Sequence, residues 1–433
     1  MTATLTAPEA ARAAGVHPLG YLRSRGYVQD VSDEEGLGAA LDAGQVTAYI
    51  GFDPSASSLH VGNLVGIMML ASLQRFGHRP IALGGGGTSL VGDPSGKTST
   101  RKLISPSDIE ANLAGVLPQF ARYLDFEGNR FGGNPPALLL NNADWLVELR
   151  YIEFLRDIGR HFSVNEMLAA ETYRVRLETT GLNFVEFNYR LVQAYDFLHL
   201  FRTLDCTLQM GGSDQWGNIV AGVDLIRRAD AGKAYALVSP LITVGSGEKM
   251  GKSEGNAVWL DAGRTSPYDY YQYWINTADD DVGRFLRLYT FLPESRISEL
   301  TGVEGAALRD AKRVLAFEAT ALTHGEATAA EAETAAAALF STGRNGDGPR
   351  LDDPNLPTTE LPAAEVEAGM TLADLFVRVA LAASRGEARR LASQGGLSLN
   401  GERVTAVDDP FRPDDTLVLL RAGKKRYQRV RIV

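Results

Sequence analysis

The sequence predicts an α/β protein built on a doubly wound parallel sheet, with a helical insertion, a following α-helical domain and a small C-terminal α+β domain. A buried-strand pattern at 46–52 is followed by a loop, a helix pattern from about 62 to 76 and a second strand pattern at 79–83. This β-loop-α-β order is typical of the first unit of a parallel, nucleotide-binding sheet. After about residue 268 the pattern is helical throughout, and 433 residues suit two to four domains.

The later elements divide the chain into four segments. Strand patterns at 137–140 and around Leu208, with a helix after Asp214, continue the alternation, and the long helical stretch before Leu208 is interpreted as an insertion. Residues 308–340 form one Ala-rich amphipathic run, and residues 341–369 hold four prolines and little apolar periodicity. We therefore expect a doubly wound domain at 1–240 with an insertion at about 105–195, a helical domain at 241–345, a linker at 346–369 and a separate domain at 370–433.

The C-terminal segment has its own local signals. Thr371 with Asp374, and Ser384 with Glu387, have the spacing of helix N-terminal capping boxes. Asn400-Gly401 predicts a turn between two short strands. Residues 370–433 carry 12 Lys and Arg against 7 Asp and Glu, a net charge of +5, whereas the rest of the chain carries −15. This asymmetry favours a polyanionic partner for the segment, although a solvated charged face explains it equally well.

Composition excludes several classes of protein. The chain is 45% apolar and 22% charged, and it has no run of about 18 uncharged apolar residues, so we expect no membrane span. The N-terminus lacks the basic start and apolar run of a signal peptide. Cys206 is the only cysteine and the six histidines show no ligand spacing, which predicts a reducing, cytoplasmic setting and no protein-caged metal.

Two glycine-containing motifs follow predicted strands. His60-Val61-Gly62-Asn63 lies where the first strand meets its helix, where backbone N–H groups form an anion site, although four such residues alone more often mark a surface histidine. Gly84 to Gly87 follow the second strand and suggest backbone close to a ligand. The run from Gly92 to Thr98 is not a P-loop, because Val91 stands where that motif needs glycine.

Three further motifs carry polar groups. Tyr189, Gln193 and Asp196 have the spacing of one helix face, with a solvated stripe as an almost equal alternative. Residues 209–218 run from a strand into a glycine turn and a helix, where Asp214 could be a simple N-cap. Lys249-Met250-Gly251-Lys252-Ser253 places two lysines in a glycine-flanked loop. This arrangement suits a mobile clamp for pyrophosphate, although a single pair of lysines usually serves only solubility.

Together and in this order, these motifs resemble a known family. Residues 60–63 look like the first signature of class I aminoacyl-tRNA synthetases, and residues 249–253 look like the second. Residues 49–54, 92–97 and 211–218, with the Tyr189 set, resemble bacterial-type tyrosyl-tRNA synthetases, whose catalytic domain is Rossmann-like. Residues 370–433 are similar to the RNA-binding domain that this family shares with a ribosomal small-subunit protein. Asn63 replaces a second histidine of the class pattern, and Gly251 replaces a common serine.

The resemblance implies a ligase that activates L-tyrosine with ATP and Mg²⁺, then transfers tyrosine to the 3′ end of tRNA(Tyr). The catalytic residues that it implies are His60, Asn63, Lys97, Arg101, Lys249, Lys252 and Ser253. Those implied for tyrosine are Tyr49, Asp53, Asp93, Tyr189, Gln193, Asp196 and Gln215. Those implied for ATP are Gly51, His60, Gly62, Asn63, Gly212, Asp214 and Lys252. Those implied for tRNA are Arg385, Arg389, Arg390, Lys424 and Lys425.

The resemblance also implies a homodimer, formed through the insertion near residues 130–165, and no editing domain. Three other functions are weighed against it. A tryptophanyl enzyme of similar architecture is disfavoured by Tyr49 and Asp196, since an indole has no hydroxyl for them to bind. A small-molecule nucleotidyltransferase has no use for the helical and basic segments, and a non-catalytic RNA-binding protein leaves both signatures without a role.

Overall fold

The computed structural model describes residues 7–93, 105–169, 171–179, 181–243, 257–303, 308–342, 357–367, 369–413, 415–423 and 426–433. The chain forms two compact units. The first contains residues 1–266 and 273–324, and the second contains residues 267–272 and 325–433. Helix α12 (Pro267–Ile275) has residues in both units, and each unit is described by itself below.

A six-stranded sheet forms the centre of the first unit. Its strands are β1 (Asp30–Val31), β2 (Thr47–Phe52), β3 (Arg79–Gly84), β4 (Leu138–Asn141), β5 (Cys206–Gly212) and β6 (Tyr235–Ser239). Their order is β1-β6-β5-β2-β3-β4, and all pairs are parallel except β1 with β6. The chain leaves β2 towards β3 on one side and later returns to β5 on the other. This confirms the doubly wound fold and puts its switch point between β2 and β5.

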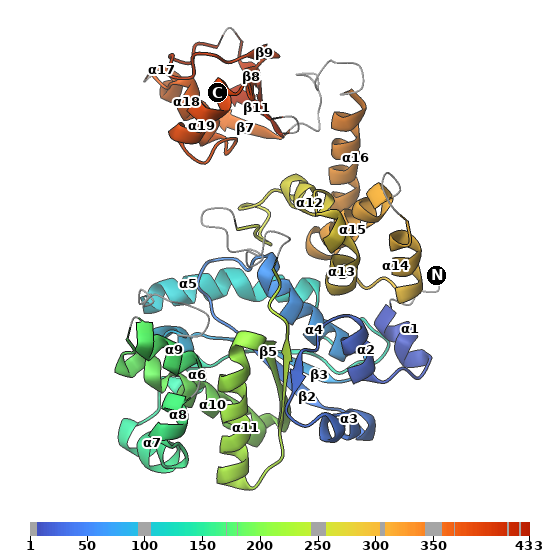
Figure 1. The fold of residues 1–433 in the computed structure, drawn as a ribbon, viewed down its shortest axis with the longest axis vertical. Helices are drawn as coiled ribbons and strands as arrows, with labels where there is room; N and C mark the ends of the chain where they lie inside the picture. The colour runs from blue at the N-terminus through green and yellow to red at the C-terminus, as the bar shows by residue number, and fades with distance from the viewer. Residues whose placement is uncertain are drawn as a thin grey trace. The chain divides into compact units, whose positions relative to one another are not determined.

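Helices cover both faces of this sheet (Figure 1). Helix α4 (Leu64–Arg75) packs on one face, where Gly66 lies beside Ile50 of β2. Helices α10 (Phe184–Leu204) and α11 (Trp216–Asp230) pack on the other, where the rings of Tyr49 and Phe197 meet edge to face at 5.4 Å. Successive residues of β2 therefore reach opposite layers, because side chains alternate along a strand.

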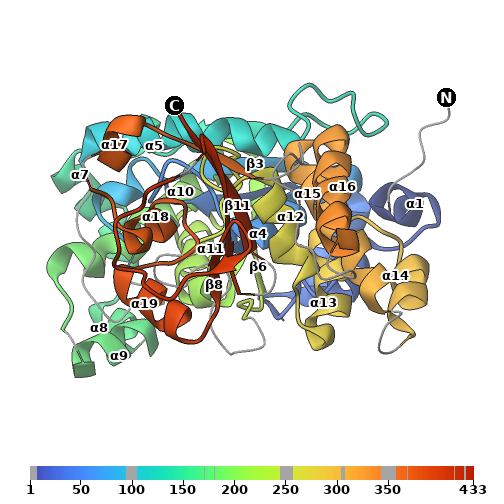
Figure 2. The same ribbon diagram turned by 90° about the horizontal axis from the view of Figure 1, so that it is seen from above.

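The remaining helices of the first unit precede β2, form the insertion, or follow the last strand of the sheet. They are α1 (Ala7–Ala13), α2 (Pro18–Ser24), α3 (Glu34–Ala43), α5 (Pro106–Val116), α6 (Ala143–Leu146), α7 (Tyr151–Asp157), α8 (Val164–Ala169), α9 (Glu171–Thr179), α13 (Asp279–Tyr289), α14 (Glu294–Thr301) and α15 (Leu308–His324). Short 3₁₀ turns are η1 (Val61–Asn63), η2 (Thr88–Leu90), η3 (Leu117–Arg122), η4 (Gly159–His161) and η5 (Ser213–Gln215). Helices α13, α14 and α15 pack against one another (Figure 2). None of the helices in the described residues is long and apolar enough to cross a membrane.

The Ala-rich run that the sequence predicts as one segment forms two helices. Helix α15 ends at His324, and α16 (Glu326–Thr342) begins directly after Gly325. Gly325 has a φ of +94°, a left-handed conformation that ends a helix and that glycine adopts without strain. The hydrophobic periodicity of the sequence continues across this glycine, so the periodicity alone could not reveal that one helix ends and another begins.

The second unit contains a five-stranded sheet with small helices. The strands are β7 (Thr358–Leu361), β8 (Leu397–Leu399), β9 (Glu402–Arg403), β10 (Leu417–Ala422) and β11 (Arg426–Ile432), in the order β7-β11-β10-β8-β9. Beside α16, which also belongs to this unit, the helices are the short α17 (Ala363–Glu367), α18 (Leu372–Arg378) and α19 (Arg385–Ser393). Leu361, Phe376 and Leu420 belong to its buried core. The capping box predicted at Thr371 and Asp374 is present, since the backbone N–H of each donates to the other residue's side chain at 3.2 Å. The one predicted at Ser384 and Glu387 is half formed: Ser384 accepts from the backbone N–H of Glu387 at 3.2 Å, but the Glu387 side chain accepts from the backbone N–H of Ala383.

Strand β7 lies in the segment that the sequence pattern assigns to the linker. It pairs in parallel with β11, far along the chain, through registers such as Thr359 with Val430. Its four residues carry only one fully buried side chain, Leu361. Such an edge strand has little hydrophobic alternation of its own, so its pairing depends on a distant partner.

Candidate functional site

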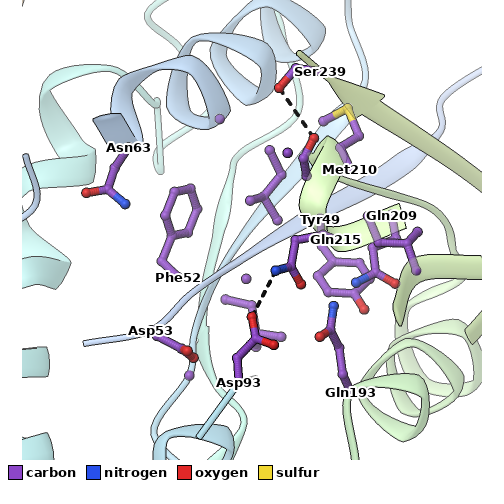
Figure 3. A pocket seen from close by; sticks show the side chains of 18 of the residues that line it. Tyr49, Phe52, Asp53, Asn63, Asp93, Gln193, Gln209, Met210, Gln215 and Ser239 are labelled. Atoms are coloured by element: carbon purple, nitrogen blue, oxygen red, sulfur yellow. Dashed lines mark hydrogen bonds between the residues drawn. The ribbon is translucent and has the colours of Figure 1, made fainter. Parts of the chain in front are cut away.

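A pocket with a cavity volume of about 260 Å³ opens where the parallel strands end (Figure 3). Its walls come from the ends of β2, β5 and β6, the residues after β3, the start of α4 and the inner face of α10. The loops that follow β2 and β5 diverge at this point, because the two crossovers lead to opposite faces of the sheet. The pocket therefore lies at the switch point, where ligands bind in folds of this kind.

Most residues proposed for tyrosine and ATP from the sequence come together in this pocket. Those that line it are Tyr49, Gly51, Asp53, Gly62, Asn63, Asp93, Tyr189, Gln193, Asp196, Gly212 and Gln215. His60 and Asp214 do not line it, although Gly62 and Asn63 of the first signature and Gln215, next to Asp214, do. Lys97, Arg101, Lys249, Lys252 and Ser253 lie outside the described residues.

Helix α10 gives one side of the pocket its polar lining. Tyr189, Gln193 and Asp196 all line the pocket, so the predicted single face is confirmed and the solvated stripe is not. The neighbouring Leu191 and Phe197 are buried, which fixes the orientation of the helix on the sheet. The spacing in the sequence therefore places three polar groups on the side of the helix that faces the cavity.

Several polar atoms of the pocket are buried without a protein partner. In Figure 3, Tyr49, Gln193 and Gln209 are grouped at one side, and Asp53 and Asn63 lie at the other. The hydroxyl of Tyr49 and the Oε1 atoms of Gln193 and Gln209 have no hydrogen-bond partner among the described residues. Buried polar atoms of this kind are suited to a polar ligand.

Asp196 is a buried acid of the pocket with a raised pKa. Its side chain is buried, and its two carboxylate oxygens accept hydrogen bonds from Asn142 Nδ2 at 2.8 Å and Trp145 Nε1 at 2.7 Å. Burial raises the pKa of Asp196 to about 7, although both donors lower it. Burial also raises the pKa of Tyr49 well above its ordinary value, and the nearby Asp196 adds to this effect.

Asn142 and Trp145 are not among the residues predicted from the sequence. Both follow β4, and the indole of Trp145 stacks on His199 of α10 with ring centroids 4.4 Å apart. Asn142 also accepts a hydrogen bond from the backbone N–H of Gly87 at 2.7 Å, which joins the ends of β3 and β4. Their position in the sequence could have indicated both residues, because polar residues soon after a parallel strand lie at the edge of the sheet where ligands bind.

Two more carboxylates line the pocket near Gln215. Asp93 accepts a hydrogen bond from Gln215 Nε2 at 2.8 Å, drawn dashed in Figure 3, and Asn218 Nδ2 donates to Gln215 Oε1 at 3.4 Å. Asp53 accepts from the hydroxyl of Thr88 at 3.3 Å. These acids make the region attractive to a positively charged group such as an ammonium.

The glycine run after β3 is explained mainly by packing. Only Gly85 of the four lines the pocket. A Cβ on Gly86 would collide with the side chain of Asn141, and one on Gly87 would lie 2.9 Å from Leu146. Gly85 therefore borders the pocket, while Gly86 and Gly87 are small because β4 and α6 lie against them. Hydrophobic patterns do not carry this information. That the run brings backbone close to a ligand stays a prediction.

The first signature folds into a reciprocal cap before α4. His60 Nδ1 accepts from the backbone N–H of Gly62 at 3.0 Å, and Asn63 Oδ1 accepts from the backbone N–H of His60 at 3.0 Å. In a neutral imidazole the accepting nitrogen carries no proton, so the proton is on Nε2. Each of these two side chains therefore carries an N–H donor in addition to the acceptor that forms the cap.

Residues 257–260 form a bridge to this signature. The backbone N–H of Val61 donates to Val258 at 3.0 Å, and that of Leu260 donates to Leu59 at 2.9 Å. The rings of His60 and Trp259 meet edge to face at 6.0 Å. The chain just after the second signature is therefore fixed to the first, by a long-range pairing that no local pattern of the sequence predicts.

Asp214 does not cap helix α11. It lies in η5, and the N-cap position of α11 belongs to Gln215, which makes no side-chain capping hydrogen bond. The interpretation of Asp214 as a simple N-cap is wrong, because the 3₁₀ turn moves the helix start beyond it.

The predicted tRNA-binding arginines all lie on α19, and each forms an exposed ion pair within its own unit. Arg385 pairs with Asp374, Arg389 with Asp408 at 2.8 Å, and Arg390 with Glu387 at 3.8 Å. Exposed pairs contribute little free energy, so these guanidinium groups can exchange partners. Lys424 and Lys425 lie outside the described residues.

Residues 41–341 match the family described as tRNA synthetases class I (W and Y), and residues 355–430 match the tyrosine–tRNA ligase SYY-like C-terminal domain. The tyrosine–tRNA ligase of Desulfosudis oleivorans is 54% identical over 94% of this chain and 97% of its own. That of Clostridium botulinum (strain Eklund 17B / Type B) is 46% identical over 95% and 98%. A C-terminally truncated mitochondrial tyrosyl-tRNA synthetase from Aspergillus nidulans has a TM-score of 0.67 at 32% identity, covering 75% of this chain and 95% of the other.

The chain belongs to the tyrosyl-tRNA synthetase family. This synthetase is therefore a tyrosine–tRNA ligase that uses ATP to join tyrosine to tRNA, as its motifs imply. A tryptophanyl-tRNA synthetase from Encephalitozoon cuniculi has a TM-score of 0.51 at 14% identity over 76% of this chain and 91% of its own, which shows a shared fold alone. The tryptophanyl alternative is not supported.

The pKa of Asp196 predicts a pH-dependent stability. Because the folded protein holds this proton up to about pH 7 while an unfolded chain releases it near pH 4, folding becomes less favourable as pH rises between the two values. The free energy of unfolding, measured by urea titration from about pH 5 to about pH 8, should fall relative to Asp196→Asn by about 3 kcal/mol, most of it below pH 7. Asp144→Asn, which changes an exposed carboxylate, is the control. A constant difference between the wild type and Asp196→Asn would contradict the assignment.

Proposed function

We propose that the pocket at the end of β2 and β5 is where tyrosine and ATP react. The observation that supports this most directly is the buried polar end of the pocket, where Tyr49 and Asp196 lie among apolar side chains. A phenol hydroxyl both donates and accepts, so it can satisfy the Tyr49 hydroxyl and an oxygen of Asp196 at once. Phenylalanine would leave these buried groups unpaired, and a site built to bind a substrate hydroxyl rejects the analogue that lacks it for this reason.

The other end of the amino acid fits the acids near Gln215. We propose that Asp93, Tyr189 and Gln193 hold the ammonium group, with Asp53 and Gln215 close to the bound amino acid. The hydrogen bond from Gln215 to Asp93 orients that carboxylate before the substrate arrives. With the phenol and ammonium both held, the substrate carboxylate faces the nucleotide, and proximity of this kind supplies much of the catalysis.

For ATP, we propose that the first signature binds phosphate oxygens. Nε2–H of His60 and the amide of Asn63 supply donors at the start of α4, where the helix dipole also favours negative charge. Gly51 has nothing within 4 Å of where a Cβ would be, which leaves room for the nucleotide, and Gly212 and Asp214 would lie at the ribose. Lys97, Arg101, Lys249, Lys252 and Ser253 are proposed to stabilise the leaving pyrophosphate.

The proposed reaction needs no protein nucleophile. A tyrosine carboxylate oxygen attacks the α-phosphorus, a new O–P bond forms, and the bond to the pyrophosphate oxygen breaks. A ribose hydroxyl at the 3′ end of tRNA then attacks the tyrosyl carbonyl and releases AMP. Among the described residues no group of three or more His, Cys, Asp or Glu could hold a metal ion. The Mg²⁺ that we expect with ATP would be held chiefly by the phosphate oxygens of the nucleotide.

The pocket assignment is tested by Tyr49→Phe in amino-acid-dependent exchange of labelled pyrophosphate into ATP. Loss of one hydrogen bond to the substrate should lower kcat/KM for tyrosine about tenfold and reduce the preference for tyrosine over phenylalanine by a similar factor. Tyr27→Phe is the matched control, because Tyr27 is also buried but donates to Leu288 outside the pocket. An unchanged preference in Tyr49→Phe would remove Tyr49 from the site.

We propose that the basic C-terminal segment binds tRNA backbone through Arg385, Arg389, Arg390, Lys424 and Lys425. The net charge of +5 on residues 370–433 and the exchangeable ion pairs of α19 support this role. Each arginine would trade an exposed carboxylate for a phosphate, so affinity should fall as salt rises.

Deleting residues 350–433 separates this role from amino-acid activation. We expect tyrosine-dependent pyrophosphate exchange to continue, because no residue of the pocket lies in the deleted segment. Charging of tRNA should fall by more than about tenfold, since the phosphate contacts are lost. Circular dichroism checks that the shortened protein is folded. Loss of both activities in a folded protein would contradict separate roles.

We also propose that the enzyme is a homodimer formed through its inserted helical region. Of fifteen large apolar side chains exposed in the described residues, ten lie between Val147 and Val185, and Ile152 is 73% exposed. Apolar surface concentrated in this way marks an interaction surface.

We also propose a cytoplasmic location, because the cytoplasm keeps Cys206 reduced and supplies tRNA. Cell fractionation would test this location.

Sedimentation equilibrium tests the dimer. The wild type should sediment as a dimer at micromolar concentration, and Ile152→Glu should shift it to monomer because a buried charge without a partner is costly at an interface. Val303→Glu introduces the same change at an exposed apolar side chain outside this region and should leave the dimer intact. A wild-type monomer that is fully active would exclude the proposal.

A further inference from the structure

A second cavity of about 240 Å³ lies beside helix α11, and it shares no lining residue with the tyrosine pocket. Its walls come from residues 161–167, from Arg190 of α10 and from one face of α11. Apolar side chains such as Met167 and Trp216 line it together with charged side chains of both signs. None of the sequence motifs described above accounts for this combination of apolar and charged side chains.

Arg190 is the unusual member of this lining. Its exposed fraction is 6%, and its Nε and Nη2 atoms have no hydrogen-bond partner among the described residues. Its guanidinium lies over the ring of Tyr173 at 4.5 Å, which is a weaker contact than an ion pair. Burial lowers the pKa of Arg190. A buried guanidinium without a counter-charge is costly, so this arrangement calls for an anion.

The carboxylates that line the cavity already have other partners. Glu166 pairs with Arg228 at 3.3 Å, and Arg228 also donates to the carbonyl of His161 at 2.6 Å. Asp224 pairs with Arg227 at 3.0 Å. Arg190 forms no ion pair within the part of the chain that the structure describes. The cavity therefore holds one positive charge that no described side chain balances.

The first turn of α11 adds to this positive character. A Cβ on Gly217 would lie 2.9 Å from Arg190 Nη2, so the guanidinium rests directly on that turn. The N-cap residue Gln215 makes no side-chain capping hydrogen bond. A helix N-terminus carries a partial positive charge and repels a cation, whereas an anion in the cavity beside both would be attracted by both.

We propose that this cavity is an oxyanion site for a phosphate group, bound by the guanidinium of Arg190 and the first turn of α11. The planar guanidinium has paired N–H donors that match a phosphate, and its Nε and Nη2 atoms are buried without a partner among the described residues. Trp216 and Met167 give apolar surface for the molecule that carries the group. The phosphate group can belong to a free small molecule or to tRNA. The site is separate from the tyrosine pocket and does not depend on the function proposed there.

Equilibrium dialysis of the full-length enzyme with labelled inorganic phosphate tests this site. Saturating tyrosine and a non-hydrolysable ATP analogue occupy the reaction pocket, so binding there does not interfere. The wild type should bind phosphate, and Arg190→Gln should weaken that binding at least about tenfold, as expected for a lost charge-assisted pair. Arg202→Gln removes the same charge from the same helix, at an exposed pair with Asp230, and should bind like the wild type.

Equal binding by the wild type and Arg190→Gln, or no binding by the wild type at millimolar phosphate, would overturn the proposal. If Arg190→Gln does not fold, Arg190→Lys keeps the charge but loses the paired donors, and should bind more weakly than the wild type. Phosphate should also raise the melting temperature of the wild type, because a ligand of the folded state stabilises it. Pyrophosphate exchange, measured in parallel, reports on the tyrosine pocket separately.

The same variants identify the source of the phosphate group. If a tRNA phosphate occupies the site, inorganic phosphate should weaken tRNA binding by the wild type at constant ionic strength and have less effect on Arg190→Gln. If a free small molecule occupies it, tRNA affinity should be the same for both proteins while labelled phosphate still distinguishes them. Either pattern supports the oxyanion site and names its occupant.

Discussion

The burial of Asp196 is the constraint on which the pocket at the switch point depends. A carboxylate enclosed by apolar side chains is unfavourable in its charged form, and two neutral donors, Asn142 and Trp145, partly offset that cost. To bring them there, the chain must pair β4 with β3 and pack α10 over the sheet, so the insertion is part of the site rather than an addition to it. In the proposed function, specificity for a phenol follows from keeping polar atoms buried and unsatisfied until a hydroxyl arrives.

The doubly wound sheet brings residues that are far apart in the chain to one of its edges. Asp53, Asp93, Asp196 and Gln215 follow or face different elements, yet all border one cavity because parallel strands end on the same side. The bridge between residues 59–61 and 258–260 extends this arrangement, since it fixes the chain after the second signature beside the first. In the proposed reaction, which needs no protein nucleophile, the main contribution of the fold is therefore to position these groups.

Charge is used differently in the two units. In the C-terminal unit, arginines of α19 are exposed and paired with exposed acids, which makes them easy to transfer to another anion. In the first unit, Arg190 is buried and forms no ion pair with any described side chain. The two environments suit a mobile polyanion at a surface and a single bound anion in a cavity, respectively.

Local patterns in the chain are enough to predict the doubly wound fold, the enzyme family and most of the pocket. The glycine turns, the strand ends and the spacing of residues 189, 193 and 196 each involve only a few neighbouring residues. They can therefore be recognised in the sequence without a structure. The folded protein was needed to show which glycines serve packing, that a 3₁₀ turn containing Asp214 precedes α11, and that residues 358–361 form an edge strand. It was also needed to place Asn142, Trp145 and Trp259 at the site and to show that Arg190 has no described counter-charge. These features depend on contacts between segments distant in the chain, and no local pattern of side chains encodes which distant groups will meet.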